Sequence, residues 1–158
     1  MTPYINYLDS RTKEDVEQFT SKNLEIWAEE AGNPQPNCMF PAMFARWMLK
    51  HSEEFKQNGK KFMHNAPYIL ANLAGLSADE AFIDWGAMSG WGLGYHVIDK
   101  KWSKEQLDIL EIPIEMMPEI KKPWDIVGHL SEKYAKETGL KQGIPICAGA
   151  GDTMQSMI

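Results

Sequence analysis

The feature that most constrains the fold is a turn of four small residues, AGAG, at residues 148–151. Ile146 and Cys147 before it predict a short buried strand, and Asp152 after it predicts the start of a helix. Small residues allow a backbone or a ligand to approach closely. An acidic side chain at a helix N-terminus is stabilised in its ionised form. The segment therefore fits an active-site carboxylate and an ordinary helix cap equally well, and both interpretations stay open here.

Proline and glycine also divide the first half of the chain. The stretch GNPQPN, residues 32–37, cannot be crossed by a helix. Thr12 and Asp15 form a capping-box pattern, which predicts a helix from this point to about Ala31. A second helix is expected to end near QNGKK. Its predicted apolar face consists of Phe44, Trp47, Met48, His51 and Phe55.

The remaining elements follow from local signals. Residues 4–8, YINYL, predict a strand, and APYILANLAGL predicts a helix that ends at Gly75. The segment FIDWGAMSGWGLGYHVID has four glycines in nine positions and predicts a strand and a bend. Ser103 and Gln106 cap a short helix. The proline-rich segment EIPIEMMPEIKKPWDIVG is expected to be an extended connection, and LSEKYAKETG a helix. This order of strands and helices predicts an α/β protein.

Composition excludes several classes of function. The chain has 158 residues, long enough for one compact domain, with 22 acidic and 16 basic residues and a net charge of −6. That balance argues against a nucleic-acid partner, and no apolar stretch is long enough for a membrane span. The two cysteines form no CxxC pair, which favours a reduced, cytoplasmic setting. Cys147 is predicted to be buried and inert, and Cys38 to be a loop thiol. The four histidines have no paired metal-ligand spacing.

Four stretches, in this order, resemble the FGGY family of carbohydrate kinases. PYINYLDSR is similar to the family's P-x-I-x-W-x-D-x-R, and ARWMLKHSEEF to K-x-x-W-x-K-x-x-x-P-E-x-F. FIDWGAMSGWGLGYHVIDKKWSKEQLDIL resembles TDYSDASGTLLFDxxxxxWSxELLxxL. GHLSEKYAKETGLKQGIPICAGAGD is similar to GxLxxxxAxxTGLxxGxPVxxGxGD. Together the four stretches span nearly the whole chain.

The resemblance implies a ribonuclease H-like, actin-like ATPase fold with inserted helices. It implies transfer of a phosphoryl group from Mg²⁺-ATP to a hydroxyl of a sugar or polyol. Asp152 aligns with the family's catalytic base. Tyr7 stands where relatives place a tryptophan against the substrate. Asp9 and Arg11 follow on the same turn, either as a structural ion pair or, for Asp9, as a contact to a substrate hydroxyl.

By the same resemblance, residues 1–158 are expected to be part of the family's N-terminal, sugar-binding domain. The opening strands and the C-terminal nucleotide domain would then lie outside the chain, and the isolated segment would be inactive. An incomplete sheet leaves a strand edge open, so self-association into a homo-oligomer is expected. Two alternatives to a kinase are a non-catalytic sugar-binding or scaffold protein that keeps the fold, and an actin-like ATPase of another branch.

Overall fold

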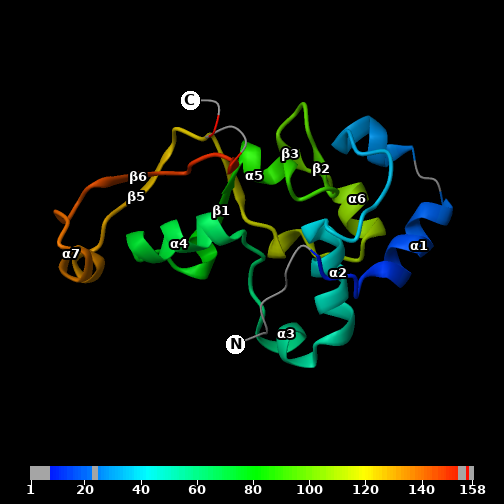
Figure 1. The fold of residues 1–158 in the computed structure, drawn as a ribbon, viewed down its shortest axis with the longest axis horizontal. Coiled ribbons are helices and arrows are strands. Elements are labelled where there is room, and N and C mark those ends of the chain that lie inside the picture. Colours follow the sequence, from blue (N-terminus) through cyan, green and yellow to red (C-terminus); the bar gives the residue numbers. More distant parts are fainter. Residues whose placement is uncertain (1–7, 23–24, 153–155, 157–158) are drawn as a thin grey trace. The chain divides into compact units, whose positions relative to one another are not determined.

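A computed structural model describes residues 8–22, 25–152 and 156 of the chain (Figure 1). The chain forms two compact units. The first unit comprises residues 1–59 and 89–114, and the second comprises residues 60–88 and 115–158. Of the strand predicted at residues 4–8, only Leu8 is among the described residues, and it lies in an exposed turn.

The first unit consists of helices and one short hairpin. Its elements in chain order are α1 (Lys13–Lys22), the π-helical turn η1 (Trp27–Ala31), α2 (Pro41–His51), α3 (Glu53–Asn58), β2 (Tyr95–His96), β3 (Lys101–Trp102) and α6 (Lys104–Ile109). β2 and β3 pair antiparallel, with Tyr95 opposite Trp102. The short 3-10 helix η3 (Ile114–Met116) follows α6.

Helix α1 begins where the sequence predicts, but the capping box is wrong. The Thr12 hydroxyl donates to the carbonyl of Cys38 at 3.4 Å, and the Asp15 carboxylate accepts from Arg46 and Lys50. Both side chains are thus used in tertiary contacts. The predicted break at GNPQPN is confirmed, because Gly32 ends η1 with a φ of 73°.

The single helix predicted over α2 and α3 is interrupted at Ser52. Ser52 is extended, with φ −115° and ψ 101°, and its hydroxyl accepts from the amide of Phe55 at 3.2 Å. A serine cap therefore starts a new helix at this point. The predicted apolar face is also wrong. The buried residues of α2 are Ala42, Met43, Ala45 and Arg46.

Only half of the predicted cap of α6 is confirmed, because Ser103 caps the helix but the Gln106 side chain does not complete the capping box. The Ser103 hydroxyl accepts from the amide of Gln106 at 3.3 Å, and Leu107 is fully buried. Gln106 itself is fully buried and links three segments of the first unit. Its amide oxygen accepts from the backbone of Gly94, and its amide nitrogen donates to Glu30 and to the carbonyl of Tyr95.

The second unit combines two small sheets with three α-helices. Its elements are α4 (Asn65–Ala74), the 3-10 helix η2 (Ala78–Glu80), β1 (Phe82–Asp84), α5 (Trp85–Ser89), β4 (Glu119–Lys121), β5 (Ile126–His129), α7 (Glu132–Thr138) and β6 (Pro145–Cys147). β1 and β4 are parallel, with Phe82 opposite Glu119 and Asp84 opposite Lys121. β5 and β6 are antiparallel.

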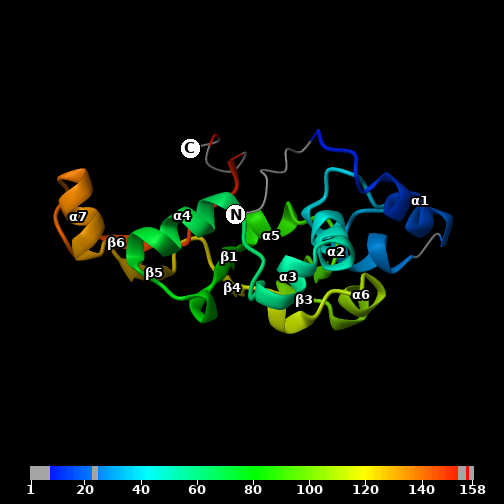
Figure 2. The ribbon, with the colours of Figure 1, turned by 90° about the horizontal axis from the view of Figure 1, so that it is seen from below.

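Helix α4 packs on β1 and β5, an arrangement that can be followed in Figures 1 and 2. Ala71, Phe82 and Ala148 form the centre of this core. The predicted ends of α4 and α7 are confirmed, because Gly75 and Gly139 adopt φ values of 73° and 74°.

Three local predictions in the second unit need correction. The segment that starts at Phe82 forms the expected strand as β1, but the short helix α5 follows it where a bend was expected. The proline-rich connection contains the strands β4 and β5. Cys147 is exposed, because β6 pairs with β5 alone among the described strands and only Ile146 of β6 is buried.

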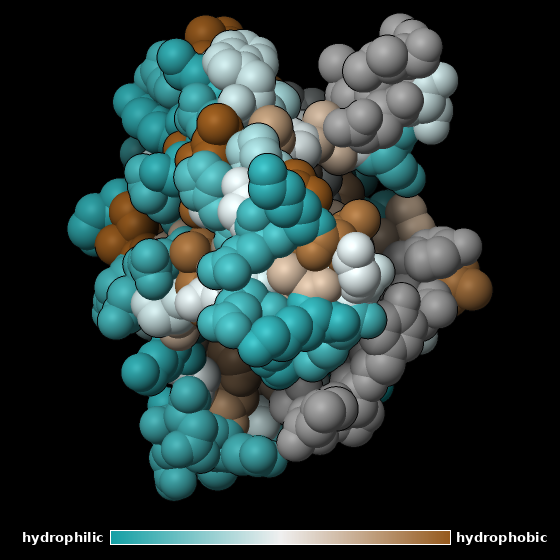
Figure 3. Space-filling view, turned by 90° about the vertical axis from the view of Figure 1, so that its left-hand side faces the viewer, coloured by the Kyte–Doolittle hydropathy of each residue, from teal (hydrophilic) through white to brown (hydrophobic). Residues whose placement is uncertain are grey.

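The face shown in Figure 3 is mostly hydrophilic, with smaller hydrophobic areas between the polar residues. Broad apolar patches mark interaction surfaces in soluble proteins. The described residues on this face form no such broad patch. None of the described helices is both long enough and apolar enough to span a lipid bilayer.

Candidate active site

The small-residue turn after β6 is tied to the segment that precedes β5. The amide of Ala148 donates to the carbonyl of Asp125 at 2.9 Å, and the amide of Gly149 donates to the carbonyl of Pro123 at 3.0 Å. Gly149 has a φ of 90°, which a residue with a side chain rarely adopts. These contacts fix the backbone of the turn three residues before Asp152.

The other side of the turn lies against the start of α5. Gly86 and Gly151 approach so closely that a Cβ atom on Gly86 would lie 2.8 Å from the amide nitrogen of Gly151. Gly86 is itself held by Asp84, whose Oδ1 accepts from the amides of Gly86 at 2.7 Å and Ala87 at 3.0 Å. Asp84 is buried, with 2% of its surface exposed.

Asp152 stands at the end of this turn and is exposed. Its carbonyl accepts from the amide of Ser156 at 2.9 Å and from the Ser156 hydroxyl at 2.8 Å. The i to i+4 bond agrees with the predicted helix start at Asp152. The rest of that predicted helix lies outside the described residues. An exposed carboxylate on a fixed backbone is accessible to a bound substrate.

His64 is a titratable group that interacts electrostatically with Asp84. It precedes α4 and is half-buried. Burial lowers the pKa of His64, and the nearby Asp84 carboxylate opposes that shift without reversing it. The imidazole is therefore neutral at physiological pH.

Two tryptophans extend from the elements that hold the turn. Trp85, the first residue of α5, contacts Trp124 edge to face, with ring centroids 5.4 Å apart. Trp124 is 65% exposed. Trp91 is buried, whereas Trp85 is half-buried.

The other predicted site residues belong to the first unit. Asp9 and Arg11 form the predicted ion pair, with 2.6 Å between Arg11 Nη2 and Asp9 Oδ2. The Arg11 side chain holds the pKa of the Asp9 carboxyl below its usual value. Tyr7 lies outside the described residues. Asp152 belongs to the second unit, whereas Asp9 and Arg11 belong to the first.

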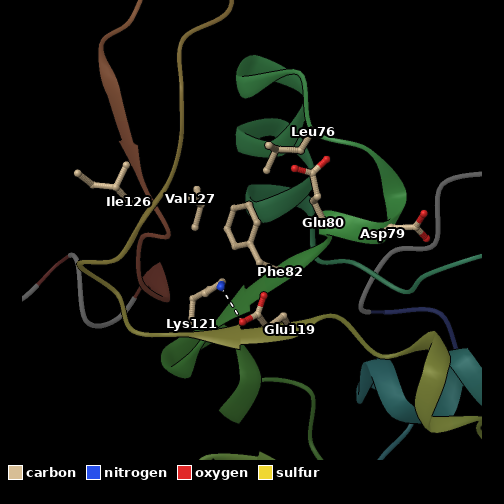
Figure 4. Close-up of a pocket in the computed structure, with 8 residues that line it drawn as sticks. All are labelled: Leu76, Asp79, Glu80, Phe82, Glu119, Lys121, Ile126 and Val127. Atoms are coloured by element: carbon tan, nitrogen blue, oxygen red, sulfur yellow. Dashed lines mark ion pairs between the residues drawn. The ribbon is translucent and has the colours of Figure 1, made fainter.

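A pocket of about 290 Å³ lies elsewhere in the second unit and does not include Asp152 (Figure 4). Its apolar wall contains Phe82, whose ring points toward Val127. Asp79, Glu80 and Glu119 contribute carboxylates, and Lys121 pairs with Glu119 at 2.6 Å. The pocket lining carries three carboxylates and one lysine. This net negative charge repels a phosphorylated ligand, so the pocket does not fit a nucleotide.

Within the described ranges, no group of three or more His, Cys, Asp or Glu side chains gathers to hold a metal ion.

Sequence reasoning missed Asp84, Gly86 and Trp124. A usable signal existed for Asp84. Asp84 ends an apolar strand, and an aspartate at that position caps the first turn of a helix. The contact between Gly86 and Gly151 left no signal, because the two glycines are far apart in the sequence and each is unremarkable alone.

Comparison with known proteins identifies the family of this chain. The model of the N-terminal domain of the FGGY family of carbohydrate kinases matches residues 1–158. A glycerol kinase of Thermococcus onnurineus is 26% identical over 151 residues, which cover 93% of this chain and 28% of that protein. The chain therefore belongs to the FGGY family of carbohydrate kinases.

Solved structures agree on the fold. A ligand-bound xylulose kinase from Lactobacillus acidophilus matches with a TM-score of 0.83 and 24% identity, over 99% of this chain and 31% of that one. A glycerol kinase from Plasmodium falciparum, solved with ADP, matches with a TM-score of 0.83 and 22% identity, over 96% and 30%. The fold is thus α/β and ribonuclease H-like, as the resemblance implied. The chain spans about 30% of the length of these relatives.

Proposed function

We propose that the protein containing this chain is an ATP-dependent kinase that phosphorylates a hydroxyl of a ketose or a polyol, with Asp152 as the general base. One observation carries the proposal. In a chain of the FGGY family, Asp152 is exposed directly after a turn whose backbone is fixed by two hydrogen bonds and by the approach of Gly86.

The proposed reaction needs a proton acceptor beside the substrate hydroxyl. A sugar hydroxyl is a weak nucleophile until its proton has an acceptor. In the proposed step the hydroxyl oxygen bonds to the γ-phosphorus of ATP while the bond from that phosphorus to ADP breaks. The proton of the hydroxyl passes to the Asp152 carboxylate. A fixed backbone before the carboxylate limits the reorganisation that the step requires.

The phosphoryl donor is assigned to parts of the protein outside this chain. Mg²⁺ would neutralise charge on the transferring phosphoryl group. The pocket of the second unit is lined by three carboxylates and one lysine, a charge balance that disfavours a triphosphate there. We therefore assign the nucleotide to the family's opening strands and C-terminal domain, and the isolated chain is expected to be inactive.

The family resemblance suggests two further substrate-binding residues, Tyr7 and Asp9. Tyr7 would place its ring against the carbon skeleton of the sugar, because aromatic faces pack on apolar sugar faces. Asp9 would accept from a substrate hydroxyl while keeping its pair with Arg11. A tyrosine where relatives have a tryptophan shortens the aromatic surface, which favours an acceptor different from theirs.

The test uses the full-length protein with Mg²⁺-ATP and a panel of ketoses and polyols. Turnover of at least one acceptor is expected, and Asp152→Asn should lower kcat by about 10²- to 10⁴-fold, the usual contribution of a general base. The acceptor should still bind to the variant, as measured by calorimetry.

Asp79→Asn is the matched control, because Asp79 is an exposed carboxylate of the same unit that lines the separate pocket. It should keep wild-type kcat. Wild-type activity in Asp152→Asn, or no turnover of any acceptor by the full-length protein, would contradict the proposal.

A further inference from the structure

The contact between Gly86 and Gly151 leaves room for a side chain at Gly151 but not at Gly86. A Cβ added to Gly86 would lie 2.8 Å from the Gly151 nitrogen, closer than real Cβ atoms approach a backbone atom. It would also lie 3.5 Å from the Gly151 Cα. A Cβ added to Gly151 would lie 3.6 Å from the carbonyl carbon of Gly86 and 3.7 Å from its oxygen, which are ordinary contacts. Only position 86 therefore requires a residue without a side chain.

Gly86 cannot easily move away from Gly151. Its amide donates to Asp84 Oδ1 at 2.7 Å, and the added Cβ would also lie 3.0 Å from that oxygen. Asp84 is buried and is fixed in β1, opposite Lys121 of β4. A side chain at position 86 would push Gly151 or break the bonds to Asp84.

The turn is anchored on the side that precedes Gly151. Before Gly151 it is anchored by the bonds from Ala148 to Asp125 and from Gly149 to Pro123. After Gly151 comes Asp152, whose side chain is exposed. A displacement forced on Gly151 would therefore pass forward to Asp152.

We infer that Gly86, held by Asp84, is a positioning residue for the Asp152 carboxylate. This inference rests on the function proposed above. A general base must lie within hydrogen-bond reach of the proton it accepts, and a misplacement of about 1 Å costs about a hundredfold in rate.

The test is steady-state kinetics of the full-length protein with three glycine variants. Gly86→Ala should lower kcat by about 10- to 100-fold while the acceptor KM changes by less than about threefold. Gly151→Ala should lose less activity than Gly86→Ala, as the unequal contact requires.

Gly128→Ala is the matched steric control, because its Cβ would lie 2.7 Å from Ala74 Cβ, an equal overlap in the same unit. It should lower the melting temperature but keep wild-type kcat per folded molecule.

A second pair of variants covers the case in which Gly86→Ala does not fold. Asp84→Ala removes the acceptor for the two amides of α5, whereas the amide oxygen of Asp84→Asn can still accept them. We expect Asp84→Ala to lose more kcat than Asp84→Asn, with the acceptor KM little changed in both. Equal losses in the two variants would overturn the inference.

The outcomes for the inference and for the proposed function are distinct. An inactive Asp152→Asn variant together with wild-type kcat in Gly86→Ala overturns the positioning role alone. A loss in Gly128→Ala as large as in Gly86→Ala does the same, since it reports a general effect of packing. An active Asp152→Asn variant overturns the general base, and the positioning role with it.

Discussion

Arg46 and Asp15 form a buried ion pair that joins α2 to α1. Arg46 and Asp15 are each 4% exposed, and the second guanidinium nitrogen of Arg46 contacts Glu111 at 3.0 Å. The guanidinium also lies over the ring of Phe19, 5.0 Å from its centroid. A charged residue thus occupies the centre of the first unit, where a buried charge is tolerated only with its partners present.

Arg46→Met should therefore destabilise the first unit by about 3 kcal/mol, since Asp15 loses its buried partner. Hydrogen exchange of the α2 amides in the full-length protein measures this local loss. The control is Lys136→Met on α7, which breaks an exposed pair with Glu132 at 2.6 Å and should leave exchange unchanged. Equal protection of α2 in both variants would show that the buried pair is dispensable.

The same pair shows where sequence reasoning ends. Gly75, Gly139 and the Ser103 cap could be predicted because their determinants lie within a few residues. The buried face of α2 could not, because Arg46 is buried only through Asp15 in another helix. Thr12 shows the same limit, since its hydroxyl bonds to Cys38.

In the candidate site, too, only features determined by nearby residues could be predicted from the sequence. The turn and the start of a helix at Asp152 could be predicted from a run of small residues followed by an acid. The approach of Gly86 could not, because it joins segments that are distant in the sequence. Exposure of Cys147 depends on which strands flank β6, and this too is a tertiary property.

His64 should make the stability of the second unit depend on pH. Burial lowers its pKa in the folded state, so between the unfolded and folded pKa values the unfolded chain binds more protons. Stability contributed by neutral His64 is present above the unfolded pKa of about 6.5 and is lost as the pH falls through the folded value. Urea midpoints at pH 7.5 and 5.5 should differ in this direction.

His64→Asn should reduce that difference, because the group that takes up the proton is gone. His129→Asn serves as the control, since His129 is exposed on β5 and should leave the difference unchanged. If the two variants lose the same amount, another group is responsible for the pH dependence.

Tyr7 should affect the acceptor and not the nucleotide. If its ring packs against the sugar, Tyr7→Ala should raise the acceptor KM by about three- to tenfold, the worth of one aromatic contact, with the ATP KM unchanged. Tyr7→Phe separates the ring from its hydroxyl. Tyr68→Ala on α4 is the control, because Tyr68 is an aromatic residue with 59% exposure outside the proposed site. An equal rise in both KM values for Tyr7→Ala would argue for a structural role.

Gln106 should be among the least replaceable polar residues of the first unit. Gln106→Leu would leave the amide of Gly94 and the carbonyl of Tyr95 without their partner in a fully buried place. Each unpaired buried group costs about 1–3 kcal/mol, so a loss of about 2–4 kcal/mol is expected. Ser103→Ala removes a single cap bond to Gln106 and should cost about 1 kcal/mol. Hydrogen exchange of the α6 amides would rank the two, and a larger loss in Ser103→Ala would show that the helix cap, and not the buried amide, holds α6 to β2.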